Sequence, residues 1–168
     1  MTAAVLLLSL VTLERLGELW LARRNTARLV AQGAAEIAPD HYPLIVVLHA
    51  AWLAGLWWLG WNHPVDFGWL AAFVLLQLLR IWVLATLGPR WTTRIIVLPG
   101  ASLVKSGPYR LLSHPNYAVV IGEIAVLPLC LGLPWYALAF SLANALVLAI
   151  RIRAENAALA GWRNERAG

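Results

Sequence analysis

Long apolar stretches are the feature that most constrains the fold of this chain. An α-helix rises about 1.5 Å per residue, so about 20 apolar residues cross the hydrocarbon core of a bilayer. With 61% hydrophobic and only 12% charged residues, the composition excludes an ordinary soluble domain. We therefore predict a single-domain, all-α integral membrane protein over residues 1–168. Its five expected transmembrane helices are residues 2–22, 43–62, 67–88, 117–133 and 134–152.

The basic residues indicate how these helices are oriented. Eleven of the 13 Lys and Arg residues fall in segments 23–42, 89–116 and 151–168, whereas the turns 63–66 and 132–134 carry none. Basic residues are enriched in cytoplasmic connections of membrane proteins. The pattern predicts an outside N-terminus and a cytoplasmic C-terminus. Because the charges lie at helix ends rather than in one patch, we expect membrane lipids as partners and no nucleic acid.

The polar segment 105–117 interrupts the apolar runs and carries the chain's strongest motif. Gly107 and Pro108 predict a turn, and Pro115 suits the first turn of a helix, where its missing N–H costs nothing. The free amides at such a helix start attract an anionic group, which His114 would flank. On spacing alone, a capped helix start with interfacial Tyr and His residues is equally compatible.

Several charged residues fall inside the predicted spans. Charges in lipid are costly and are usually paired or functional. Glu14, Arg15 and Glu18 lie in the first span and Arg80 in the third, at comparable depth. One interpretation is an ion-pair cluster that joins Arg80 to Glu14 or Glu18, and the other is the polar floor of a substrate pocket. Glu123 would either bind a cofactor or neutralise Arg80.

The fifth span carries a polar stripe. Asn144, Leu148, Arg151 and Glu155 follow the spacing i, i+4, i+7 and i+11, which places them on one helical face. Asn144 is a polar group that needs a partner when buried. Arg151 and Glu155 lie level with His114 at the inner edge. On spacing alone, these two also fit an ordinary basic helix end with an i,i+4 ion pair.

Few residues outside these motifs suggest a specific chemical role. The single cysteine, Cys130, excludes a disulfide framework and a Cys-based metal site, and we expect no metal. His49 is a weak substrate-side candidate, since a lone His among apolar residues is more often a hydrogen-bonded core residue. No dinucleotide or Walker motif is present. The connection 89–116 and the tail would have to cover any nucleotide-like cofactor.

Together these motifs resemble the isoprenylcysteine carboxyl methyltransferase family. The resemblance rests on Gly107-Pro-Tyr-Arg110 and His114-Pro-Asn-Tyr117, with Leu87–Arg94 upstream and Arg151–Glu155 downstream. It implies a small membrane methyltransferase that uses S-adenosylmethionine. The N-terminal half, with Glu14-Arg15 and Glu18-Leu19, resembles a bacterial branch associated with type III polyketide synthases. That branch methylates hydroxyls of long-chain alkylpyrones or alkylresorcinols, so such a synthase is a possible functional partner.

The resemblance also implies roles for individual residues. The catalytic residues would be His114, Arg151 and Glu155. The cofactor-binding set would be Gly107, Pro108, Tyr109, His114, Pro115, Asn116, Tyr117, Asn144, Arg151, Arg153 and Glu155. A weaker substrate-pocket set is Glu14, Arg15, Glu18, His49, Arg80, Trp91, Arg94 and Glu123. Asn156 stands where many relatives have a second Glu. The acceptor would be a lipophilic molecule that enters laterally from the bilayer, either a hydroxyl compound or a prenylcysteine-type carboxylate.

Two rival functions remain at this stage. Membrane sterol reductases show a similar Gly-Pro-Tyr and His-Pro-Asn-Tyr pattern followed by Gly-Glu, here Gly122-Glu123, and would bind NADPH. The matches through Trp91–Arg94 and Arg151–Glu155 favour the methyltransferases. A non-enzymatic membrane scaffold would use its intramembrane charges only to pair helices, and would not need the segment 105–117.

Overall fold

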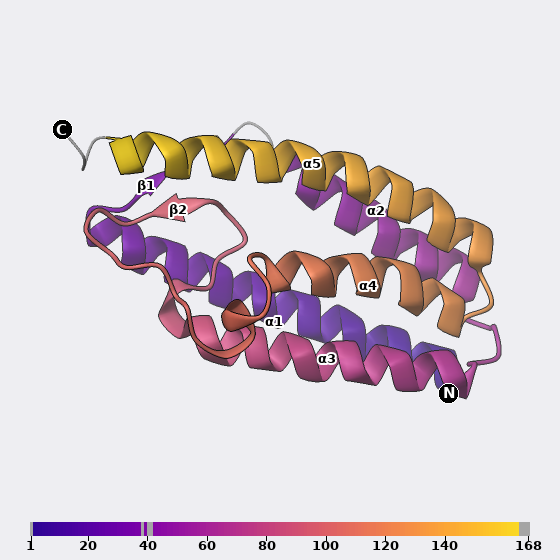
Figure 1. Cartoon of the computed structure of the whole chain (residues 1–168). Helices are drawn as coiled ribbons and strands as arrows, with labels where there is room; N and C mark the ends of the chain where they lie inside the picture. The colour runs from indigo at the N-terminus through magenta and orange to yellow at the C-terminus, as the bar shows by residue number, and fades with distance from the viewer. Residues whose placement is uncertain (1, 38, 40–41, 165–168) are drawn as a thin grey trace.

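The computed structural model describes residues 2–37, 39 and 42–164, with side chains as far as Glu155. Five helices dominate this part of the chain and lie side by side (Figure 1). They are α1 (Ala3–Ala31), α2 (Tyr42–Gly60), α3 (Phe67–Leu87), α4 (Pro115–Cys130) and α5 (Pro134–Asn164). Two short strands, β1 (Ala35–Glu36) and β2 (Ile96–Val97), and the 3₁₀ turns Gly88–Arg90 and Gly107–Arg110 complete it.

Length and composition make this a membrane protein. Within the described residues, three segments are long and apolar enough to cross a bilayer: Tyr42–Gly60, Phe67–Arg90 and Pro134–Glu155. The helix α4 is apolar but shorter. The helix α1 has 29 residues, with three charged side chains in its middle. The prediction of a mostly helical membrane protein is confirmed, whereas five complete spans and their orientation stay predictions.

Two helices run further than the sequence indicated. The helix α1 continues to Ala31 because no Gly or Pro interrupts residues 18–31, and Ala, Leu and Arg favour helix. It ends just before Gly33, whose φ of 87° few other residues adopt. The helix α5 continues to Asn164, beyond the expected end at residue 152. The helix α4 ends at Cys130, three residues early, at a turn where Gly132 has φ 68°.

At the end of the bundle opposite the basic connections, hydrogen bonds hold the turns together. The Asp66 carboxylate accepts hydrogen bonds from two amides in the first turn of α3, at 2.8 and 3.0 Å. Its own backbone amide donates to the Cys130 carbonyl at 2.8 Å, at the end of α4. The Thr2 hydroxyl donates to the Trp61 carbonyl at 2.9 Å. These bonds fix the start of α1 and α3 against the ends of α2 and α4.

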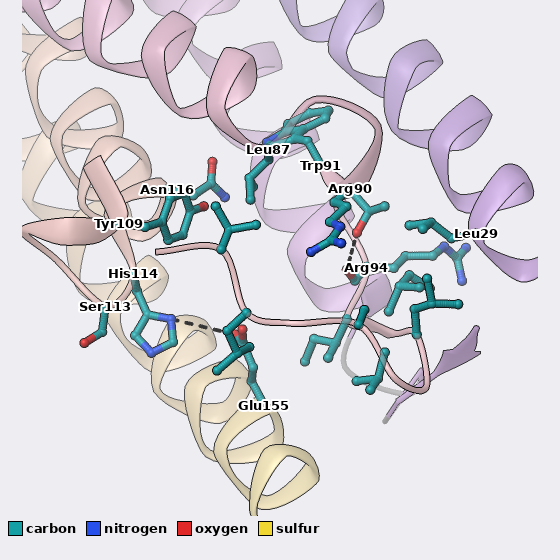
Figure 2. A pocket seen from close by; sticks show the side chains of 18 of the residues that line it. Leu29, Leu87, Arg90, Trp91, Arg94, Tyr109, Ser113, His114, Asn116 and Glu155 are labelled. Atoms are coloured by element: carbon teal, nitrogen blue, oxygen red, sulfur yellow. Dashed lines mark hydrogen bonds and ion pairs between the residues drawn. The ribbon is translucent and has the colours of Figure 1, made fainter. Parts of the chain in front are cut away.

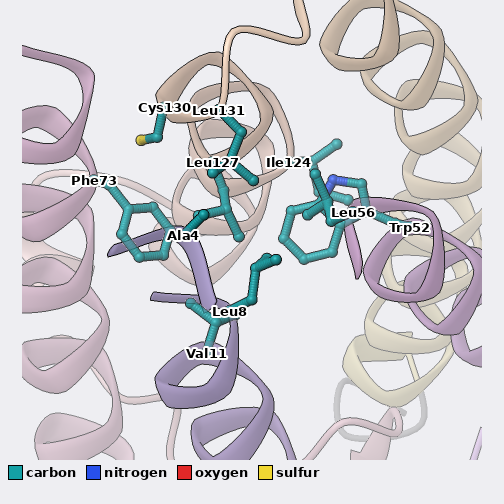
Figure 3. Packing of buried hydrophobic residues seen from close by; sticks show 10 residues of the cluster. All are labelled: Ala4, Leu8, Val11, Trp52, Leu56, Phe73, Ile124, Leu127, Cys130 and Leu131. Carbon is teal, nitrogen blue, oxygen red and sulfur yellow. The ribbon is translucent and has the colours of Figure 1, made fainter. Parts of the chain in front are cut away.

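The apolar core adjoins these turns. Residues from α1, α2, α3 and α4 and the turn after α4 interdigitate there (Figure 3). The cluster comprises Ala4, Leu8, Val11, Trp52, Leu56, Phe73, Ile124, Leu127, Cys130 and Leu131. Because lipid tails are as apolar as these side chains, the interdigitated cluster stabilises the bundle through van der Waals packing rather than through removal of apolar surface from water. This core stabilises the bundle at one end, and the polar groups gather further along it.

The connection between α3 and α4 folds back over the other end of the bundle. The Asn25 side chain on α1 donates to the carbonyls of Gly88, at 3.2 Å, and Trp91, at 2.8 Å. The strands β1 and β2 pair antiparallel, which holds the connection against the segment that follows α1. Figure 1 shows this connection at the same end as the C-terminal part of α5, with the N-terminus at the opposite end.

Candidate functional site

A cavity of about 1010 Å³ lies between this connection and the nearby ends of α4 and α5 (Figure 2). Residues of the connection between positions 90 and 105 form one wall, and α4 and α5 form the other. Six of the residues that the family resemblance assigns to the cofactor line it: Tyr109, His114, Asn116, Tyr117, Arg151 and Glu155. Two from the weaker substrate set, Trp91 and Arg94, line it as well.

The start of α4 is positioned by glycine and proline residues behind the cavity wall. Gly107 has φ 55°, and a Cβ there would collide with the Thr86 hydroxyl and lie 3.2 Å from the Trp82 indole nitrogen. Pro108 is buried in the same turn, and Pro115 is the first residue of α4. None of these three lines the cavity. They shape the backbone that presents the neighbouring side chains.

The helix start offers fewer free amides than the sequence suggested. Pro115 has no N–H, and the amides of Tyr117 and Ala118 both donate to the His114 carbonyl, at 3.1 and 3.3 Å. Of the first four positions, only the Asn116 amide is left for an anion in the described part of the chain. The Asn116 side-chain oxygen is also buried without a hydrogen-bond partner. An unpaired buried acceptor in a cavity wall is a place for a ligand donor.

Tyr117 joins α4 to α5 through a chain of polar contacts. Arg151 Nε donates to the Tyr117 hydroxyl at 2.9 Å, and that hydroxyl donates to the Glu155 carboxylate. Arg151 Nη1 also donates to the Thr93 carbonyl at 2.7 Å. The His114 ring stacks on the Tyr117 ring with centroids 5.1 Å apart, and its Nδ1 lies 4.0 Å from Glu155 Oε2. Residues far apart in the sequence thus meet at one edge of the cavity.

The predicted polar face of α5 is confirmed by burial. Asn144, Leu148 and Arg151 are all buried. Asn144, however, lies outside the cavity wall, and Arg153 is exposed and also outside it. The Asn156 side chain falls outside the described residues. Arg151 and Glu155 are therefore the members of the stripe that the structure brings to the cavity.

Tyr109 adds a neutral donor to the cavity wall. Burial raises the pKa of its hydroxyl to about 12, and the nearby Glu155 carboxylate acts in the same direction. A phenol is less stable as an anion when it is desolvated and close to a negative charge. At neutral pH, Tyr109 therefore stays protonated and able to donate.

The charge balance of the cavity favours anions. Arg90, Arg94, Lys105 and Arg151 line it against the single carboxylate of Glu155. Arg90 is held by a hydrogen bond of 2.7 Å to a carbonyl across the connection. A cleft lined by one sign of charge concentrates ligands of the opposite sign. The cavity thus has donors for a negatively charged group and one acceptor for a positive group.

The intramembrane charges form a separate group. Arg80 donates to Glu18 at 2.9 Å and, through Nε, to Glu123 at 2.7 Å. Arg15 donates to Glu18 at 2.8 Å and to Glu123 at 3.0 Å. The predicted ion-pair cluster is confirmed for Glu18, and Glu14 contacts its edge at 3.7 Å from Arg15. None of the five lines the cavity, and their role in a substrate pocket stays a prediction.

His49 likewise lies outside the cavity wall. Its Nδ1 is 2.8 Å from the Ile45 carbonyl, one turn back in α2. Sequence reasoning missed the Thr93 carbonyl, which holds Arg151, because a backbone acceptor leaves no mark in the residue pattern. It also missed Ser113, which lines the cavity beside His114.

This chain is similar to two proteins along most of its length. The uncharacterized protein YpbQ of Bacillus subtilis is 39% identical over 168 residues, covering 92% of this chain and 95% of that protein. An uncharacterized protein of Haemophilus influenzae is 27% identical over 143 residues, covering 81% and 83%. No solved structure matches. Residues 69–161, which include the start of α4 and the polar face of α5, match the Isoprenylcysteine carboxyl methyltransferase (ICMT) family, and the chain belongs to that family.

Proposed function

We propose that this membrane methyltransferase uses S-adenosylmethionine to methylate an oxygen atom of a lipophilic acceptor. The observation that carries the proposal is one polar group at the cavity edge, in which Tyr117 joins Arg151 and Glu155 beside His114. Family membership supports methyl transfer over the NADPH-dependent reductase and over the scaffold that the sequence left open.

The residues in the cavity fit the cofactor. S-adenosylmethionine carries a carboxylate, an ammonium group, ribose hydroxyls and an adenine. Arg151 and the Asn116 amide would hold the carboxylate, and Glu155 would hold the ammonium group or the ribose hydroxyls. The buried Asn116 oxygen, which has no partner among the described residues, would accept from a ligand N–H. Once bound, the cofactor supplies a methyl group on a positively charged sulfur.

The chain's own task is to hold and deprotonate the acceptor. A phenol or enol must lose its proton, and His114 or Glu155, whose Nδ1 and Oε2 atoms are 4.0 Å apart, would take it. A carboxylate acceptor would need no base. Arg151 and Tyr117 keep Glu155 in place through their hydrogen bonds. Alignment of the acceptor oxygen with the methyl carbon supplies much of the rate enhancement in such displacements.

For the acceptor we propose a long-chain polyketide hydroxyl or a prenylcysteine-type carboxylate, with a type III polyketide synthase as a possible partner in the first case. The five spans would place the N-terminus outside and the cavity on the cytoplasmic face of a bacterial inner membrane. The gathering of basic side chains at the cavity end supports this orientation. A C-terminal tag that is accessible only from outside intact cells would contradict it.

The test is a calorimetric titration of the protein in lipid nanodiscs, with S-adenosylhomocysteine and with NADPH separately. We expect saturable binding of S-adenosylhomocysteine alone, weakened at least tenfold in Arg151→Gln. The matched control is Arg23→Gln, which removes a charge at the same end of the bundle but outside this cavity. Binding of NADPH alone, or of neither ligand, would overturn the proposal.

A further inference from the structure

The turn Gly107–Arg110 packs against the side of α3 rather than beyond its end. A Cβ at Gly107 would lie 3.2 Å from the Trp82 indole nitrogen. Trp82 belongs to the apolar segment Phe67–Arg90, which is long enough to cross a bilayer. It precedes Arg90 by eight residues, which at a rise of 1.5 Å per residue places it about 12 Å inside the basic end of that segment. The turn therefore lies at the depth of the membrane, although it belongs to a connection.

Exposed apolar side chains follow this turn. Leu111 and Leu112 come directly after it, and they are 78% and 49% exposed. On α3, Ile81 and Trp82 are exposed as well. A single exposed leucine would need no explanation, but two adjacent leucines beside an exposed tryptophan at membrane depth are typical of a surface that contacts lipid.

The backbone of the turn is suited to an apolar environment. A free backbone N–H group in lipid costs several kcal/mol, so such groups must be paired within the protein. The amides of Leu111 and Leu112 both donate to the Pro108 carbonyl at 3.1 Å, and the Tyr109 amide donates to the Ser106 carbonyl at 3.1 Å. Pro108 itself has no N–H. The turn can therefore leave water without exposing these donors to lipid.

The charge of the connection fits an anionic surface. No Asp or Glu occurs between Asp66 and Glu123, whereas the connection carries the basic residues Arg90, Arg94, Lys105 and Arg110. Arg110 is exposed at the end of the turn, next to Leu111. The long apolar stem of an arginine lets its charged end reach the lipid head groups while its neighbours lie deeper. Anionic head groups attract basic residues near the membrane surface.

We propose that residues 107–112 form an anchor that enters the membrane leaflet at the basic end of the bundle. Leu111 and Leu112 contact acyl chains, and Arg110 binds an anionic head group of the same leaflet. A second copy of this chain would also cover the leucines, but it would bring two basic connections together, and like charges oppose such a contact.

The anchor is continuous with the cavity wall. Tyr109 lies within it, Ser113 and His114 follow it directly, and all three line the cavity. The lipid therefore holds one side of the cavity in place. This role is independent of the reaction, since it concerns the bilayer and not the ligand.

The experiment measures how strongly lipids brominated on their acyl chains quench a bimane label, with one protein in each nanodisc. The buried Cys130 is replaced by alanine, and the label is attached at Leu111→Cys. Leu78→Cys, on the exposed surface of α3, is the lipid reference, and Gln32→Cys, after the end of α1, is the water reference. We expect quenching at position 111 to approach that at 78 and to exceed that at 32 by about threefold. Quenching at 111 no greater than at 32 would overturn the proposal, and Leu112→Cys repeats the test if Leu111→Cys does not fold.

A second measurement tests the head group. Phosphatidylglycerol, mixed into phosphatidylcholine nanodiscs, should increase quenching at position 111, because it attracts Arg110 to the surface. Arg110→Gln should remove this increase. The matched control, Arg28→Gln, changes an exposed basic residue at the same end of the bundle and should retain it. An increase that survives in Arg110→Gln, or that both variants lose equally, would overturn the role of Arg110. Neither measurement uses a cofactor, so both results are independent of the proposed function.

Discussion

The bundle contains two groups of polar side chains that bind one another. The group in the middle of the bundle comprises Arg15, Glu18, Arg80 and Glu123, whereas the group beside the cavity at its end comprises Tyr117, Arg151 and Glu155. Both groups join separate helices through charged hydrogen bonds. They differ in how far the side chains are buried and in whether they line a cavity. Arg80 and Glu123 are 4% and 3% exposed and face each other through two hydrogen bonds. Glu155 and His114 keep 26% and 30% of their side-chain surface exposed, at a distance of 4.0 Å.

This difference indicates that the group in the middle of the bundle stabilises the fold, whereas the group beside the cavity binds a ligand. In the first group, the opposite charges of Arg80 and Glu123 compensate the cost of leaving water, although Arg15 Nε and the neighbouring Gln77 oxygen are buried without a partner among the described residues. A partly bonded group at a cavity edge has its side chains oriented but retains free donors and acceptors, such as the Asn116 oxygen. Charge in the membrane is thus a poor guide to the site by itself. A buried polar atom without a partner indicates the site better when it also lines a cavity, as the Asn116 oxygen does.

The largest effect is expected from Glu123→Leu. It removes the acceptor for Arg80 Nε and Nη2 and for Arg15 Nη2, so three charged donors lose their partner. Removal of one partner from a buried ion pair costs about 3–5 kcal/mol. We expect the free energy of unfolding to fall by that amount in a reversible SDS titration from mixed micelles.

The control for this variant is Glu14→Leu, the same substitution at the edge of the network. Glu14 is 30% exposed and accepts from the Gln77 amide, so we expect a loss of about 1–2 kcal/mol. Equal losses for Glu123→Leu and Glu14→Leu would show that Glu123 contributes no more to the network than the residue at its edge.

The double variant Arg80→Met, Glu123→Leu should recover most of that loss. It removes both members of the most buried pair and leaves Arg15 paired with Glu18 at 2.8 Å. Replacement of a buried ion pair by apolar residues of similar volume is often neutral for stability. We expect unfolding free energies within about 2 kcal/mol of the wild type, with S-adenosylhomocysteine affinity unchanged. A strictly additive loss from the two single variants would contradict the coupling.

Local chemistry explains what the sequence predicted well. The turn at Gly107 and the helix start at Pro115 follow from backbone preferences of single residues, and the structure places both as expected. The buried face of α5 follows from a helical period. The pairing of Arg80 with Glu18 follows from the cost of charge in lipid. Each prediction needs only neighbouring residues or a general rule about the bilayer.

Long-range contacts explain what the sequence did not determine. Whether Glu123 neutralises Arg80 or faces a ligand depends on how α3 and α4 pack, and the residue pattern allows both. The Thr93 carbonyl that binds Arg151 belongs to a connection whose path is set by Asn25 and by the β1–β2 pair. The residues that enclose the cavity therefore became apparent only once the connection had been placed over the ends of α4 and α5.

The smallest effect on stability is expected from Tyr117→Phe. This variant is also the most direct test of the group beside the cavity. The ring remains to stack on His114, but Arg151 Nε loses an acceptor and Glu155 loses a donor. Such a loss costs about 1 kcal/mol of stability. S-adenosylhomocysteine affinity should fall about tenfold in a calorimetric titration, because two ligand-binding side chains are no longer held together.

The matched control is Tyr136→Phe, which removes a hydroxyl that donates to the Trp52 carbonyl at 2.8 Å. It should cost similar stability with no change in S-adenosylhomocysteine affinity. If both variants bind the ligand equally well, the hydroxyl of Tyr117 serves the packing of α4 on α5, and the contrast between the two charged groups disappears.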